Sequence, residues 1–219
     1  MTEGLGLYPG EQLAAVMPGE RSTYVALLSQ KGWALCLAGH ILGGGPAKDN
    51  LRPNMVLFDV TKYGAPVAGC WARSEQDLLM ATRKGLAVRL AVKKVPNQGC
   101  LGIRLDPDDA AVSIVAVGEQ DGVFLLGADG KGAVRLMPGF AAFKSPGAGG
   151  KVLFKTDKLV GALRVGDADD LFIISRSGKI IRFAAAEVPP KEGGVQGVNC
   201  MALRNDECVA LAASPQQKE

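Results

Sequence analysis

The chain has 219 residues, a formal net charge of +3 and a pI near 8.6. Its length allows one sizeable domain or two small ones, and the mild charge does not reach the pI above about 9 typical of strongly basic nucleic-acid-binding domains. A case for nucleic acid must therefore rest on how the charges are arranged. The 29 Gly and 12 Pro predict many turns, which favours an all-β fold.

The cysteines indicate a reducing compartment. Their number is odd and no C-x-x-C pair occurs among them: Cys36, Cys70, Cys100, Cys200 and Cys208. We expect each to act as a small buried apolar residue in a cytoplasmic protein. The N-terminus has no basic region followed by an apolar run, and no stretch approaches about 18 apolar residues, so we expect neither a signal peptide nor a membrane span.

Four segments share one pattern, in which an apolar run leads into a short polar turn ending in Gly and a second apolar run follows. In chain order they are Val25–Leu37, Leu78–Leu90, Val123–Leu136 and Leu171–Phe183. Each turn glycine would supply a positive φ. These glycines (Gly32, Gly85, Gly130 and Gly178) are 53, 45 and 48 residues apart. That period predicts a propeller-like array of small antiparallel sheets, with no helix of normal length.

A second pattern of strand, acidic or Pro/Gly turn, and strand lies between the hairpins. It covers Leu5–Val16, Asn54–Cys70, Ile103–Val117, Val152–Leu163 and Val198–Leu211. The chain begins and ends with this half-repeat, so either its first and last segments help to close a ring or the chain is cut in mid-blade. We expect one domain over residues 1–213, with repeats near 4–53, 54–102, 103–150 and 151–213, and a disordered tail at 214–219.

Charge follows the repeats. Leu78–Leu105 has six basic and no acidic residues, Asp106–Asp121 has five acidic and no basic ones, and Gly122–Thr156 has five basic residues against Asp129. Because equivalent positions of a repeat fold stack on the same rim, this predicts one basic and one acidic rim. The returning strands carry arginines that we expect to align: Arg89, Arg135 and Arg182.

A basic rim would neutralise phosphates and release counterions, so that affinity falls steeply with salt. The sequence has no recognition helix, zinc finger or RNA-stacking aromatic motif. We therefore predict DNA binding without sequence preference and sensitive to bending. Charge reversal at the three arginines should weaken it. The alternative is a propeller-like protein-interaction module that does not bind DNA, with charged residues that merely solvate exposed strands.

Nothing in the sequence indicates catalysis or metal binding. His40 is the only histidine and lies in a loop, where a solvated role is the better interpretation. The acidic turn of Asp106, Asp108 and Asp109 lacks the glycine and final glutamate of an EF-hand loop, and no Cys/His cluster has ligand spacing. The glycine-rich stretches match neither phosphate-loop pattern. We expect no catalytic residue, no metal and no cofactor.

Two segments resemble a known family. DLLMATRKGLAVRL (77–90) followed by GCLGIRL (99–105), and DLFIISRSGKIIRF (170–183) followed by GVQGVNCMALRNDECVAL (194–211), resemble the repeats of the C-terminal domain of the DNA gyrase A protein. The corresponding protein of topoisomerase IV shares these repeats. The second and fourth repeats match best, and the likeness spans nearly the whole chain.

The resemblance implies a β-pinwheel, a propeller-like ring whose blades exchange strands. It implies a non-catalytic, nucleoid-associated domain, monomeric in isolation, that bends duplex DNA around its rim and serves the breakage-reunion core and the ATPase subunit. Mapped onto matching positions, the phosphate contacts would be Arg83, Lys84, Arg89, Arg104, Lys131, Arg135, Arg176, Lys179 and Arg182. Loop lysines that would join them are Lys93, Lys94, Lys144, Lys151 and Lys155.

The sequence departs from the family pattern in three respects. The nearest match to the gyrase box Q-R-R-G-G-K-G is Pro146–Val152, which keeps Gly-Gly-Lys and loses both arginines. The chain has about four repeats, against roughly six in a full family domain. Its tyrosines, Tyr8, Tyr24 and Tyr63, lie in the repeats and not in a nucleophile context. The loss of the two arginines leaves open whether this box supports tight chiral wrapping, and we expect no strand cleavage by this chain alone.

Overall fold

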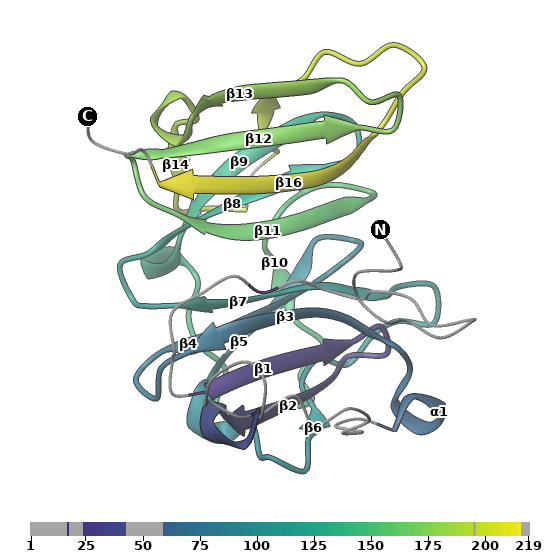
Figure 1. Cartoon of the computed structure of the whole chain (residues 1–219), viewed down its shortest axis with the longest axis vertical. Coiled ribbons are helices and arrows are strands. Elements are labelled where there is room, and N and C mark those ends of the chain that lie inside the picture. The colour runs from purple at the N-terminus through teal and green to yellow at the C-terminus, as the bar shows by residue number, and fades with distance from the viewer. Residues whose placement is uncertain (1–16, 18–23, 43–58, 195, 216–219) are drawn as a thin grey trace, which may run out of the picture.

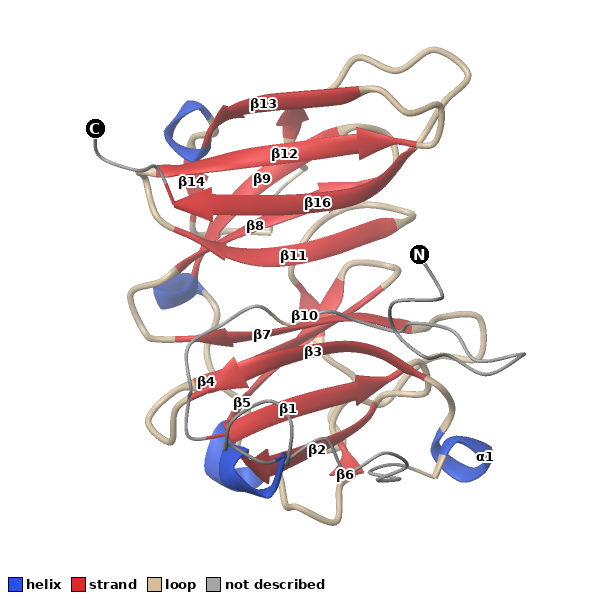
Figure 2. Cartoon of the chain, in the orientation of Figure 1, coloured by secondary structure: helices blue, strands red, loops and turns tan. Residues whose placement is uncertain are grey.

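The computed structural model describes residues 17, 24–42, 59–194 and 196–215, and strands dominate these residues (Figure 2). The described helices are single turns: η1 (Gly39–Leu42), α1 (Val60–Tyr63), η2 (Val92–Lys94), η3 (Met137–Gly139) and η4 (Ala185–Glu187). The carboxylate of Asp59 caps α1 by accepting from the Thr61 amide at 3.0 Å. The predicted all-β class, with only short helical turns, is confirmed.

The described strands form four small sheets, or blades, each built on one predicted hairpin (Figure 1). Blade 1 has the order β3 (Pro66–Ala72), β1 (Tyr24–Ser29), β2 (Trp33–Ala38) and β6 (Cys100–Leu101). Blade 2 has the order β7 (Ala111–Val117), β4 (Asp77–Thr82), β5 (Leu86–Ala91) and β10 (Lys151–Val152).

Blades 3 and 4 continue this arrangement. Blade 3 has the order β11 (Leu159–Val165), β8 (Gly122–Gly127) and β9 (Lys131–Leu136), and β9 also pairs with β14 (Pro190–Lys191) and β15 (Val198–Asn199). Blade 4 has β16 (Cys208–Pro215), β12 (Asp169–Ser175) and β13 (Ile180–Ala184). Strand β16 therefore includes Ser214, which the sequence analysis assigned to a tail, and residues 216–219 lie outside the described part.

The blades exchange strands. The two-residue strand β6 follows the hairpin of blade 2 in the chain but pairs with β2 of blade 1. The chain then returns to blade 2, where β7 pairs with β4. The third repeat donates β10 to blade 2 in the same way, and the fourth donates β15 to blade 3. The predicted β-pinwheel is therefore confirmed.

The carbonyl of each turn glycine in blades 1–3 receives two hydrogen bonds from the next repeat. In blade 2, the carbonyl of Gly85 accepts from the amides of Leu153 and Phe154 at 2.9 and 3.1 Å. The equivalent bonds run from Gly102 and Ile103 to Gly32 (2.9 and 3.2 Å), and from Cys200 and Met201 to Gly130 (3.0 and 3.1 Å). The hairpin turn is thus a joint between repeats.

This joint requires glycine for two reasons. Gly85 has a φ of +77°, which disfavours any residue with a Cβ, and a Cβ there would lie 2.0 Å from the carbonyl oxygen of Phe154. Gly178 in blade 4 has a similar φ of +80°, but a Cβ would meet nothing within 4 Å among the described residues. Only the first three turn glycines are held by a close approach as well as by φ.

The core consists of three apolar clusters, each between consecutive blades. Leu28, Met80 and Ile103 belong to the first, and Phe154 to the second. The third joins blades 3 and 4. No core cluster of described residues joins blade 4 to blade 1, and these two lie at opposite ends of the long axis (Figure 1). The half-repeat predicted at residues 5–16, one candidate for ring closure, lies outside the described residues.

No helix in the described part of the chain is long and apolar enough to cross a membrane. All five cysteines are free; Cys36 and Cys208 are buried and the other three are half-buried.

We expect Gly85→Ala to destabilise the fold much more than Gly178→Ala. Both place an L-residue at positive φ, which costs about 1–2 kcal/mol, but only the first also collides with the following repeat. The expected loss for Gly85→Ala is about 3 kcal/mol or more. Urea denaturation of both variants measures the difference; equal losses would contradict the role of the joint.

Candidate nucleic-acid interface

The three predicted arginines do not form one column. Arg89 and Arg182 are each the fourth residue after their turn glycine, whereas Arg135 is the fifth after Gly130. Val134, and not Arg135, is at the position equivalent to Arg89. Val134 pairs with the third residue of β8, as Arg89 pairs with the third residue of β4. Because successive residues of a strand point to opposite faces, Arg135 lies on the other face of its blade. The predicted alignment is wrong.

Arg89 is buried between blades 2 and 3, with 2% of its surface exposed. Its Nε donates to Asp77 at 2.7 Å, and its Nη1 donates to the carbonyls of Met137 and Phe140 at 2.9 and 3.1 Å. Its Nη2 donates to Glu119. With its donors engaged by two carboxylates and the next blade, Arg89 is an interblade connector. Its burial and its internal partners argue against the predicted phosphate contact.

Arg182 makes the equivalent ion pair in blade 4, through Nε to Asp170 at 2.9 Å. Its side chain is nevertheless 65% exposed, against 3% for Arg89. The difference arises because no described blade packs on this face of blade 4. A phosphate at Arg182 would have to compete with the carboxylate already bound to it.

Arg135 is 4% exposed and its Nη2 donates to the carbonyl of Gly139 at 2.9 Å. Its Nε and Nη1 have no hydrogen-bond partner among the described residues. Desolvation lowers the pKa of this guanidinium. Burial beside the ring of Phe140 argues against the predicted phosphate contact here too.

The predicted separation into a basic and an acidic rim is also wrong, because strand pairing brings the two signs together. Lys84 Nζ lies 2.5 Å from Asp108, and Arg83 donates to the Asp108 carbonyl. The hydrogen bond from Lys84 holds the pKa of Asp108 below its usual value. In blade 4, Arg176 pairs in the same way with Glu207. In blades 2 and 4, the acidic turn thus neutralises the basic hairpin turn of its own blade.

The predicted cations therefore differ in whether their charge is available to a ligand. Two are buried, and four form ion pairs: Lys84, Lys131, Arg176 and Arg182. Seven others are exposed and make no ion pair with the described residues: Lys93, Lys94, Arg104, Lys144, Lys151, Lys155 and Lys179. Arg83 is also exposed and forms no ion pair with these residues, but its guanidinium already donates to the carbonyl of Asp108. These eight retain charge that no ion pair with the described residues compensates.

Four of the unpaired cations gather around the glycine-rich loop that resembles the gyrase box. Lys94 Nζ donates to the carbonyl of Lys144 at 2.7 Å. Lys151 Nζ lies 5.3 Å from the ring centroid of Phe143. The amide of Arg104 donates to the carbonyl of Ala148 at 2.9 Å. We refer to Lys94, Arg104, Lys144 and Lys151 as the basic loop cluster. Lys94 and Arg104 thus bring positive charge to a box that lost its two arginines.

Sequence reasoning could have found part of this arrangement. Counting from each turn glycine would have shown that Arg135 is out of register. It could not have found the basic loop cluster, because Lys94 and Lys144 are 50 positions apart and only the packing of the loops joins them.

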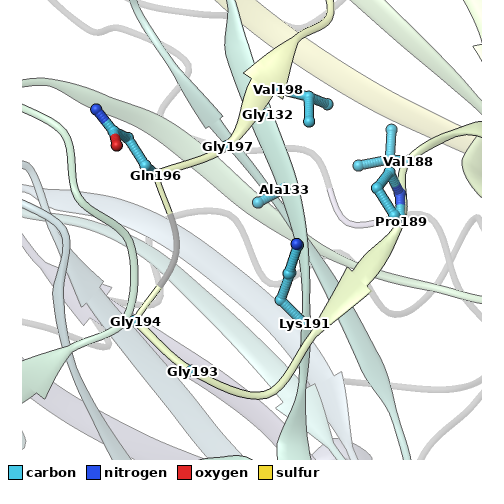
Figure 3. A pocket seen from close by; sticks show the side chains of 10 residues that line it. All are labelled: Gly132, Ala133, Val188, Pro189, Lys191, Gly193, Gly194, Gln196, Gly197 and Val198. Carbon is cyan, nitrogen blue, oxygen red and sulfur yellow. The ribbon is translucent and has the colours of Figure 1, made fainter.

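No catalytic arrangement accompanies the basic loop cluster in the described part of the chain. A cavity of about 330 Å³ lies beside β9 and is lined mainly by glycine and apolar residues, with Lys191 and Gln196 as its polar side chains (Figure 3). None of the described lining residues is an acid or a nucleophile. His40 is exposed in η1, and the described residues contain no group of His, Cys, Asp or Glu suited to hold a metal ion.

Comparison with known families finds a match over residues 76–117 and 169–214 to the family described as the DNA gyrase C-terminal domain, beta-propeller. These segments contain the hairpins of blades 2 and 4. The match therefore falls on the two repeats that carried the predicted resemblance.

Curated relatives are DNA gyrase A proteins. That of Kosmotoga olearia is 29% identical over 67% of this chain and 19% of its own length, and that of Chlamydia trachomatis is 28% identical over 94% of this chain and 26% of its own. The chain thus spans about a quarter or less of the length of these relatives.

Solved structures agree in fold. The C-terminal domain of DNA topoisomerase IV superposes with a TM-score of 0.69 at 11% identity, covering 88% of this chain and 62% of that one. The C-terminal domain of E. coli ParC gives a TM-score of 0.62 at 16% identity, covering 88% and 79%. Together with the sequence matches, these confirm the resemblance predicted from the repeats.

Arg89→Ala should destabilise the protein by roughly 3–5 kcal/mol, because it leaves Asp77 and two carbonyls at an interblade contact without their donor. Arg182→Ala removes the equivalent but exposed pair and should cost less than about 1 kcal/mol. Thermal denaturation of both variants tests this. Similar losses would mean that Arg89 does not connect blades 2 and 3.

The cysteines should react slowly in the native protein. Burial raises the pKa of the Cys36 thiol to about 11 and that of Cys70 to about 12. At pH 8 the thiolate of Cys36 is then about one part in a thousand, and its fraction rises only as the pH approaches 11. Alkylation should therefore be far slower in native than in denatured protein; equal rates would contradict the burial.

Proposed function

We propose that this chain, whose second and fourth repeats match the gyrase C-terminal domain family, binds and bends duplex DNA without sequence preference as an accessory part of a type II topoisomerase. The observation that carries the proposal is the basic loop cluster, four exposed cations without acidic partners among the described residues, around the box-like loop. Its partners would be duplex DNA, the breakage-reunion core and the ATPase subunit.

Unpaired cations are the ones that gain most from phosphate. Each contact with a phosphate releases condensed counterions, and this release supplies most of the free energy of non-specific binding. A cation such as Lys84 gains less, because a phosphate must first displace the carboxylate of Asp108 at 2.5 Å. We therefore assign the main contacts to the basic loop cluster, with Lys93, Lys155 and Lys179 as further contacts.

Bending follows from the spread of these cations along the row of blades. They run from Lys94 after the hairpin of blade 2 to Lys179 in the turn of blade 4. A duplex that contacts several blades must curve, at a cost on the order of 1–6 kcal/mol for 20–30 base pairs. The added phosphate contacts would offset this cost. No described element has the form of a recognition helix, which supports backbone contacts over base readout.

A protein-interaction module is the second candidate. The observation that favours it is the internal neutralisation of the hairpin turns, exemplified by Lys84 with Asp108 and Arg176 with Glu207. In this case the repeats would bind a protein partner, and DNA affinity would be weak at any salt concentration.

Titration of a labelled duplex at several salt concentrations separates the two candidates. The triple variant Lys94→Ala, Lys144→Ala and Lys151→Ala should weaken binding for any sequence and reduce the log–log salt slope by about 3, about one unit for each lost contact. The matched control Lys131→Ala removes a lysine that already pairs with Asp129 at 3.2 Å and should have little effect.

A minicircle of the same sequence should bind more tightly than linear DNA, because its bending cost is already met. Affinity that is absent at low salt, or independent of salt, would overturn DNA binding and favour the interaction module. Equal affinity for circle and linear duplex would overturn the bending.

A further inference from the structure

The outer edge of blade 4 differs from the outer edges of the other three blades. In blades 1–3 the second hairpin strand pairs on its outer side with a two-residue strand donated by the next repeat. In blade 4 that strand is β13, which pairs with β12 and with no other described strand. Blade 4 therefore has an acceptor edge without a donor among the described residues.

The three donated segments share one pattern. Each begins with a glycine at positive φ, continues with two strand residues, and ends with two amides that bind a turn glycine. The opening glycines are Gly99, Gly150 and Gly197, with φ of 81°, 84° and 75°. The last residue of each is a buried apolar side chain: Ile103, Phe154 and Met201. The pattern is thus Gly-x-x-x-apolar.

The register is the same in all three blades. In blade 2, Lys151 pairs with Ala87, the second residue after the turn glycine, and Val152 pairs with Leu86, the first. The pairs Cys100 with Ala34, Leu101 with Trp33, Val198 with Gly132 and Asn199 with Lys131 repeat it. The equivalent residues of blade 4 are Ile180 and Lys179, followed by the carbonyl of Gly178.

In blade 4, side chains of the hairpin strands are exposed at positions where the equivalent side chains of blade 2 are buried. Ile180 is 62% exposed, whereas its equivalent Ala87 is fully buried. Ile174 on the neighbouring strand is 36% exposed, and Arg182 on the same face is exposed where Arg89 is buried. An apolar face beside an unpaired strand edge is a surface suited to β-strand addition.

We infer that the outer edge of blade 4 binds, in trans, an extended polypeptide segment of the pattern Gly-x-x-x-apolar. The two residues after the glycine of the segment pair with Ile180 and Lys179, and its next two amides donate to the carbonyl of Gly178. The occupant that we propose is a segment of another protein. The three described donor segments of this chain are engaged in its own blades and are therefore not free to be donated by a second copy. This inference does not depend on DNA binding.

The test uses the full chain and a synthetic peptide of residues 97–105, labelled at its N-terminus and carrying Cys100→Ser to prevent oxidation. Fluorescence anisotropy in about 0.3 M salt suppresses charge attraction. We expect saturable one-to-one binding, protection of the Ile180 amide from hydrogen exchange, and at least tenfold weaker binding to Ile180→Lys. Val60→Lys, at a similarly exposed apolar residue in α1, is the matched control and should bind as the wild type does.

A second control acts on the peptide alone. Methylation of the amide nitrogens of Gly102 and Ile103 removes the two donors for the Gly178 carbonyl and should weaken binding at least tenfold, whatever the protein variant does to folding. Absent binding up to about 1 mM peptide, equal binding of the methylated peptide, or binding unaffected by Ile180→Lys would overturn the inference. Self-association of the chain that Ile180→Lys abolishes would assign the edge to a second copy and overturn it as well.

Discussion

The paired hydrogen bonds from each repeat to the turn glycine of the preceding blade are the interaction on which the rest of this structure depends. In blade 2 they run from Leu153 and Phe154 to the carbonyl of Gly85. They anchor the donated strand, bury Phe154 between blades 2 and 3, and require glycine in the turn. They also place Lys151 in the donated strand, so the same joint that holds two blades together positions a member of the basic loop cluster.

The fold uses part of its sequence-predicted charge internally. Arg89 is satisfied by carboxylates and carbonyls at an interblade contact, where removing either partner would leave an uncompensated polar group. Lys84 and Arg176 are neutralised by acidic turns of their own blades. The charge available to a ligand is therefore only part of the predicted total, and it lies mainly in turns and loops, with Lys151 in the donated strand β10. A mild net charge is consistent with such a surface, because local arrangement and not net charge determines where phosphate can bind.

Blade 4 shows what a blade looks like when no described blade follows it. Arg182 keeps the carboxylate partner equivalent to that of Arg89 but remains exposed, and Gly178 keeps its positive φ without the close approach. Lys179 beside Ile180 provides a charge next to the open edge, a common means of preventing uncontrolled strand pairing. The local design of the repeat is thus retained in a blade that no described blade follows. The ion pair and the positive φ are therefore features of the hairpin itself, whereas burial of the arginine and the close approach at the glycine depend on the next blade.

The sequence by itself determined the all-β class, the four hairpins, their turn glycines and the family resemblance, because strand alternation and positive φ are local requirements written in a few consecutive residues. Only the tertiary structure decided which cations are available. Lys84 and Asp108 are 24 positions apart and meet through strand pairing, and Lys94 reaches Lys144 through loop packing. A shift of one residue moved Arg135 to the opposite face. Contacts between distant segments depend on register and packing, which composition and repeat spacing do not specify.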